Sequence, residues 1–297
     1  MGISPKPRRY HLMGYLLIIV YTLLNLGESI FVRNYAKKYG SGGMIMNAII
    51  ALFASLFFLV TDSDGFNAPL EMIPLALINA SLFAIGYYCG FAAYKHGPYG
   101  LTRLIGNFAL LFTIFYAIFF LGEEPKVTTY LGIVMIIASM VLINYKKKTD
   151  DEHEVSFKWI ILVTLSLVAN GFIGILTRMQ QIMFENSCSS EFQVISIGGS
   201  FLLLAVIGII IDRDKLPYVM KHGTLYGLMA GLCNGAKNFL TLIIYLLLPL
   251  SVISPMKTGI GLVATFIMAL LVYKEKYSKR QLIGVGAGAA AVIILAF

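Results

Sequence analysis

The sequence predicts an all-α polytopic membrane protein with ten transmembrane helices in two inverted five-helix repeats. Composition is the first of three supporting observations, because the 297 residues are 58% hydrophobic and only 13% charged. A soluble domain carries about a quarter charged residues. The second observation is that apolar runs of about 20 residues, long enough to cross a hydrocarbon core of about 30 Å, recur along the whole chain. The third is that the ends of the two halves resemble each other.

The first half contains five predicted spans, which are residues 12–32, 43–60, 72–94, 99–121 and 127–145. The links between them read RNYAKKYGSGG, TDSDGFNAPLE, KHGPYG and GEEPK. Each link combines charged residues with Gly or Pro, which end an apolar helix. The opening MGISPKPRRY resembles the start of a signal peptide, but the apolar stretch that follows is too long for one. We therefore expect the first helix to be retained.

The second half contains five more predicted spans, which are residues 158–180, 191–211, 222–247, 250–273 and 279–297. The most polar link of the chain, KKKTDDEHEVSF, precedes them and separates a first repeat, residues 1–148, from a second, residues 149–297. The links ENSCSSE and DRDKLPYVMKHG follow the sixth and seventh spans.

The two halves end in the same pattern. Glu123 closes one span and Gly132 follows nine residues later, as Gly284 follows Glu275. An odd number of spans in each repeat makes the two halves insert in opposite orientations. Inverted repeats of this kind are common in secondary transporters, which bind substrate at the repeat interface.

These features resemble the drug/metabolite transporter superfamily, in particular its EamA-like group, over nearly the whole chain. The segments most similar to the group are LTRLIGNFALLFTIFYAIFFLGEE, AKNFLTLIIYLLLPLSVISPMKTG and ALLVYKEKYSKRQLIG. The resemblance implies two five-helix repeats and transport of a solute that it does not identify. The tryptophan often found in the group's first span is absent, because the single Trp is Trp159.

The net charge of +8 reflects Lys and Arg in the loops, which is typical of membrane proteins and does not indicate nucleic-acid binding. Far more of the loop cations fall on the side opposite the two termini. The positive-inside rule then places both termini outside, whereas the family resemblance implies that both are inside. We expect a multi-pass protein of the plasma membrane, in contact with membrane lipids and of unknown oligomeric state.

Lys237 is the most unusual residue of the apolar spans, because it lies near the middle of the eighth. A lysine there costs about 2.5 to 3.5 kcal/mol on insertion scales, and its side chain cannot easily reach either interface. The same helical face carries three more polar residues, Asn234, Asn238 and Thr241. A glycine row, Gly223, Gly227, Gly231 and Gly235, allows a neighbouring helix to approach closely. We expect Lys237 to face a polar cavity, where it binds an anionic group or pairs with Glu28. The alternative is a purely structural buried ion pair.

The ninth and fourth spans supply further candidates for substrate binding. Lys257 lies about 10 Å inside the ninth span, although snorkelling to the interface is an alternative. Pro255, close before it, favours a local break in the helix. Arg103 occupies the corresponding region of the fourth span, with Asn107 one turn further in, and an interface anchor is its alternative role. Tyr87 of the third span is a candidate pore-lining residue.

Glu28 lies late in the first span and shares a face with Asn25. It resembles the proton-coupling Glu in the first helix of the small multidrug resistance proteins, relatives of this superfamily. Burial would raise its pKa and allow proton exchange near neutral pH. The alternative is a Glu near a helix end that pairs with Arg33 or Lys37.

The sequence therefore predicts a secondary transporter of a small polar organic solute, working by alternating access. Lys237, Lys257 and Arg103 favour a carboxylate-bearing or zwitterionic metabolite such as an amino acid, with protons as the candidate coupling ion. The runner-up is a proton-coupled exporter of cationic or drug-like compounds, and a channel or scaffold is a further alternative. We find no GxSxG or HExxH pattern, metal-ligand spacing or nucleotide-binding loop, so we expect no enzyme, no cofactor and no bound metal.

Overall fold

The computed structural model describes residues 8–40, 42–61, 65–96, 102, 105–144, 156–271 and 278–296. Their regular structure includes ten α-helices, two short 3₁₀ helices and no strand. The α-helices are α1 (Arg8–Tyr39), α2 (Gly43–Thr61), α3 (Ile73–His96), α5 (Ala109–Phe119), α6 (Val127–Asn144), α7 (Phe157–Met183), α8 (Ser189–Ile211), α9 (Leu216–Leu247), α10 (Leu250–Leu271) and α11 (Lys279–Ala296). Seven of the described helices are long and apolar enough to cross a membrane. The predicted all-α membrane fold with ten helices is confirmed.

The fourth span is described in part. Residues 105–107 are helical, a turn follows at Phe108, and α5 continues to Phe119. This apolar segment, Ile105–Phe119, falls within the predicted span of residues 99–121.

Pro255 lies inside α10, which runs without interruption from Leu250 to Leu271, so the predicted break in the backbone is wrong. The proline sits in the second turn of the helix. It removes one backbone hydrogen bond near the N-terminal end of α10, where the helix tolerates the loss.

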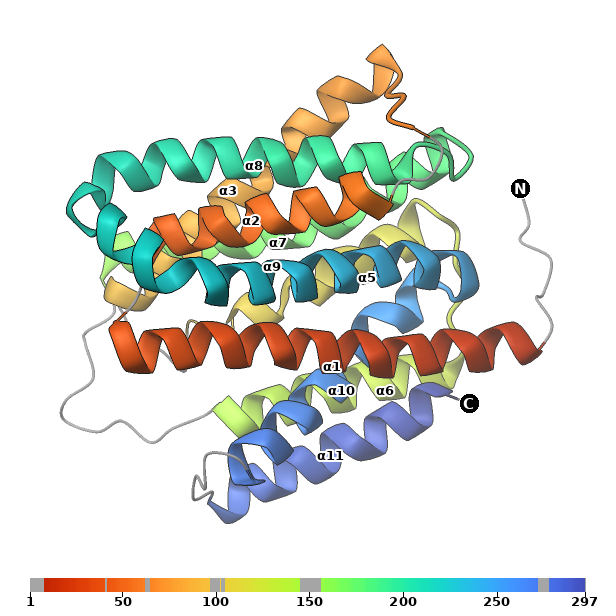
Figure 1. Cartoon of the computed structure of the whole chain (residues 1–297). Coiled ribbons are helices and arrows are strands. Elements are labelled where there is room, and N and C mark those ends of the chain that lie inside the picture. Colours follow the sequence, from red (N-terminus) through yellow and green to blue (C-terminus); the bar gives the residue numbers. More distant parts are fainter. Residues whose placement is uncertain are drawn as a thin grey trace.

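The helices pack in matched pairs across the bundle. In the described residues α1 packs along α9 and α3 packs along α7, while α2 contacts both α8 and α9 and α3 contacts α8. The last spans of the two halves, α6 and α11, also pack together. The start of α1 and the end of α11 lie at the same end of the molecule (Figure 1). Two similarly built halves in opposite orientations would give this pattern of contacts.

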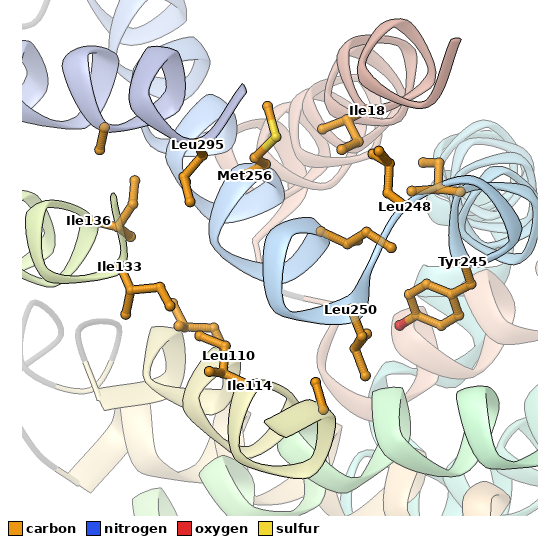
Figure 2. Packing of buried hydrophobic residues seen from close by; sticks show 14 of the residues in the cluster. Ile18, Leu110, Ile114, Ile133, Ile136, Tyr245, Leu248, Leu250, Met256 and Leu295 are labelled. Atoms are coloured by element: carbon orange, nitrogen blue, oxygen red, sulfur yellow. The ribbon is translucent and has the colours of Figure 1, made fainter. Parts of the chain in front are cut away.

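A buried hydrophobic cluster joins the two halves. It includes Ile18 of α1, Leu110 of α5, Ile133 of α6, Tyr245 of α9 and Leu295 of α11. Figure 2 shows these side chains converging around α10. On the outside of the bundle, large apolar side chains such as Val60 and Phe120 are exposed, as expected for helices that face lipid.

The glycine row of α9 packs against neighbouring helices. A Cβ atom added to Gly231 would lie 2.8 Å from the backbone oxygen of Ile50 on α2, and one added to Gly235 would lie 2.7 Å from the Cβ of Phe57. A Cβ on Gly223 would approach the ring of Tyr35 on α1. The absent side chains thus let α9 lie close to both helices, which brings its polar face against α1.

Candidate functional site: a buried charge network beside a cavity

Lys237 points from α9 toward α1 and forms an ion pair with Glu28. Only 14% of the Lys237 side chain and 15% of the Glu28 side chain are exposed, so the pair lies within the protein rather than in lipid. The lysine also donates a hydrogen bond of 3.0 Å to Oδ1 of Asn25, one turn before Glu28 on α1. These contacts meet the hydrogen-bonding needs of an ammonium group inside the bundle.

Two asparagines of α9 extend the network. The Nδ2 of Asn234 donates to Oε1 of Glu28 at 2.9 Å, and the Nδ2 of Asn238 donates to Oδ1 of Asn234 at 2.9 Å. Both carboxylate oxygens of Glu28 are therefore engaged, one by Lys237 and the other by Asn234.

Lys257 adds a second cation to the network from α10. Its Nζ donates to Oγ1 of Thr241 at 3.0 Å and lies 3.8 Å from the centre of the Tyr21 ring, a cation–π contact. Thr241 in turn donates to the backbone oxygen of Lys237 at 2.9 Å. Within the described part of the chain, the network thus combines two ammonium groups with the one carboxylate of Glu28.

A cavity of about 490 Å³ lies next to this network. One wall is aromatic and comes from α3, with Phe83, Tyr87 and Phe91. The other walls carry hydroxyl and amide groups: Asn47 of α2, Thr102, Asn107, and Ser166 and Asn170 of α7. Because α2 and α3 belong to the first half and α7 to the second, the cavity lies between the halves.

Tyr87 links the cavity with the charge network. It lines the cavity and interacts electrostatically with Glu28, Lys237 and Asn234. Of the predicted substrate-binding residues, Tyr87 and Asn107 line the cavity. The structure gathers Asn25, Glu28, Asn234, Lys237, Asn238, Thr241 and Lys257 in the adjacent network. Arg103 lies outside the described residues.

Three residues of the cavity wall are absent from the predicted set of site residues. Asn47, Ser166 and Asn170 are polar residues within apolar spans, and that signal is visible in the sequence. Their convergence depends on how α2 and α7 pack around α3 and cannot be seen from spacing along one helix. No group of three His, Cys, Asp or Glu side chains in the described segments is placed to hold a metal ion.

The comparisons with known proteins agree with this architecture. The model of the EamA-like transporter family matches residues 12–145. Among the solved structures, 29 chains match; one crystal structure aligns over 97% of this chain and 96% of its own, with a TM-score of 0.73 and 11% identity. At that identity the likeness shows the fold alone. The search of curated sequences returns no match. The family match lies within the first half of the chain, and the fold match extends over nearly all of it.

Proposed function

We propose, from the membership of the chain's first half in the EamA-like transporter family, that this protein is a secondary active transporter. In this proposal it moves a small polar organic solute with a carboxylate group, either an anion or a zwitterion such as an amino acid. It works by alternating access between two inverted repeats. The matched packing of α1 on α9 and of α3 on α7 supports the repeat arrangement.

The observation that carries the proposal is the cavity between the halves. Its volume of about 490 Å³ suits a small metabolite, and its walls combine aromatic surface with amide and hydroxyl groups. Ligand sites at the interface of inverted repeats are typical of secondary transporters.

The charge of the adjacent network favours a carboxylate. Lys237 is balanced by Glu28, whereas Lys257 contacts a hydroxyl and an aromatic ring. The described network therefore carries one positive charge in excess, which attracts an anionic group to the neighbouring cavity. A cation exporter would instead need a free carboxylate, and Glu28 is engaged by Lys237 and Asn234.

Transport assays with purified protein in liposomes test this function. We expect saturable uptake and counterflow of at least one carboxylate-bearing or zwitterionic metabolite, found first by a thermal-shift screen. Saturable transport restricted to cationic compounds would favour the runner-up. Uptake that never saturates and shows no counterflow would indicate a channel and contradict the proposal.

Proton coupling is proposed for Glu28 because it is a buried carboxylate beside Tyr87 and the cavity. Coupling requires that transport depends on pH, and Glu28→Gln should flatten that dependence because the amide cannot exchange protons. Glu71→Gln, at an exposed position before α3, is the matched control. Initial rates measured across pH that change in the same way in wild type and Glu28→Gln would exclude this role.

A further inference from the structure

The α7 wall of the cavity presents hydrogen-bond acceptors. The hydroxyl of Ser166 donates to the backbone oxygen of Gly86 on α3 at 3.1 Å. The Nδ2 of Asn170 donates to the backbone oxygen of Ser166 at 2.7 Å and lies 3.3 Å from the Ser166 hydroxyl. A backbone carbonyl can only accept, so this contact fixes the orientation of the Asn170 amide.

These contacts determine which hydrogen-bonding groups of this wall remain available to a solute. The hydroxyl hydrogen of Ser166 and the amide nitrogen of Asn170 are engaged within the protein, while Oδ1 of Asn170 accepts no hydrogen bond from the described residues. Asn170 is an exposed residue that lines the cavity. A solute that forms a hydrogen bond with Oδ1 of Asn170 must therefore offer an N–H or O–H donor.

The helix pair α1–α9 shows which donor fits such an asparagine. There, Asn25 on the first span of one half accepts a hydrogen bond from the ammonium group of Lys237, on the third span of the other half. In the pair α7–α3 the asparagine is Asn170, again on a first span, and the facing residue of the third span is Gly86. A Cβ added to Gly86 would lie 3.2 Å from Nδ2 of Asn170. In the second pair the facing residue carries no ammonium group, and Asn170 lines the cavity.

We propose that Oδ1 of Asn170 binds the amino group of the transported solute, in the manner in which Asn25 binds the ammonium group of Lys237. This inference rests on the proposed function and narrows its substrate class to carboxylate-bearing solutes that also carry an amine. The described residues of the cavity wall include no carboxylate, so the amine is held by hydrogen bonding rather than by an ion pair. The positive network behind Tyr87 attracts the opposite, anionic end of the same solute.

Matched sets of ligands test this assignment on the purified full-length protein by isothermal titration calorimetry. One set is leucine, 4-methylpentanoate, which lacks the amino group, and 3-methylbutylamine, which lacks the carboxylate; equivalent sets cover the other neutral amino acids. We expect wild type to bind at least one amino acid more tightly than its deaminated partner. Asn170→Ala should weaken binding of that amino acid roughly ten- to a hundredfold, as expected for a hydrogen bond to a charged group. Its affinity for the deaminated acid should not change.

Further variants separate a binding role from a structural one. Asn170→Asp keeps the acceptor and should retain amino-acid binding, while Asn67→Ala, at an exposed position before α3, should change neither affinity. If Asn170→Ala does not yield monodisperse protein, Gly86→Ala crowds the same space and should weaken amino-acid binding selectively.

Three outcomes would overturn the assignment, and they differ in whether they also contradict the proposed substrate class. Equal weakening of both ligands by Asn170→Ala would make the residue structural. Equal wild-type affinity for amino acids and deaminated acids would refute the amine site but leave a transporter of anions. Binding of no carboxylate-bearing ligand by wild type would refute the proposed substrate class together with the site.

Discussion

Lys237 is a full charge near the middle of a membrane-spanning helix, and its environment explains how the helix tolerates it. A lysine at that depth costs about 2.5 to 3.5 kcal/mol on insertion scales. Glu28 supplies the opposite charge and Asn25 supplies an acceptor, both from α1. Removing one partner of such a pair leaves an uncompensated buried charge, which costs more than removing both.

The variant Lys237→Met tests this dependence, because it keeps the side-chain length and removes the charge. We expect a loss of about 3 to 5 kcal/mol of stability in thermal unfolding, since Glu28 is left buried without its partner. The double variant Lys237→Met/Glu28→Gln should recover much of that loss.

The matched control is Lys215→Met, which breaks the ion pair with Asp212 at a lysine that is 51% exposed. That change should cost less than about 1 kcal/mol. If Lys237→Met were no more destabilising than Lys215→Met, the ion pair with Glu28 would not be what stabilises this part of the bundle. Transport by Lys237→Met at the wild-type rate would count against a role in binding the solute.

At the scale of single helices, contacts from the opposite half define where two helices begin. The carboxylate of Glu123, in the link between α5 and α6, accepts hydrogen bonds from the backbone N–H groups of Leu250 at 2.8 Å and Ser251 at 2.9 Å. Asp212, after α8, accepts one from Met44 at the start of α2 at 3.1 Å. A carboxylate at a helix start satisfies free N–H groups and interacts favourably with the helix dipole.

The variant Glu123→Gln should destabilise the protein by about 1 to 2 kcal/mol, because an amide keeps one acceptor oxygen and loses the charge. Thermal unfolding in detergent measures the effect. Glu124→Gln, at the exposed neighbouring position, removes the same charge without touching α10. Equal melting temperatures for the two variants would show that the cap contributes nothing.

The close packing of α9 on α2 depends on the absence of a side chain at Gly231. A Cβ there would lie 2.6 Å from the Cβ of Phe53 and 2.8 Å from the backbone oxygen of Ile50, so Gly231→Ala should cost about 1 to 3 kcal/mol. A Cβ on Gly261 of α10 would meet nothing within 4 Å, so Gly261→Ala should be neutral or slightly stabilising. Similar melting temperatures for both variants would argue against the helix approach described here.

At the scale of the whole molecule, ten crossings would place the start of α1 and the end of α11 on one side of the membrane. The two lie at the same end of the bundle in Figure 1. Six spans precede the link between α7 and α8, and seven precede the turn between α8 and α9. We therefore expect exposed residues in these two segments, such as Ser187 and Asp214, to lie on opposite sides of the membrane.

Cysteine labelling tests both the number of crossings and the orientation. In a variant without Cys89, Cys188 and Cys233, a membrane-impermeant thiol reagent should label Ser187→Cys in intact cells. It should reach Asp214→Cys only after the cells are opened, because the distribution of loop charges predicts that the termini lie outside. The reverse pattern would keep the ten crossings but invert the orientation, as the family resemblance implies. Labelling of both positions in intact cells would contradict the topology.

Much of this protein is determined by local sequence. The ten spans follow from apolar runs and polar links, because a helix in lipid must satisfy its backbone within one segment. The polarity of Lys237, Glu28 and Asn170 is equally visible, since any charge or amide inside an apolar span stands out. The glycine spacing of α9 indicates a close neighbour, although it does not identify α2 as that neighbour.

What only the tertiary structure decided is which of these residues meet. Lys237 pairs with Glu28 across more than two hundred positions of chain, and Asn170 faces Gly86 rather than a second lysine. The cavity lies between α2, α3 and α7, whereas Lys237 contacts α1. Such pairings depend on the rotation and neighbours of each helix, which are set by packing between helices. The apolar pattern that specifies each helix is nearly the same in all of them and so carries little information about its partners.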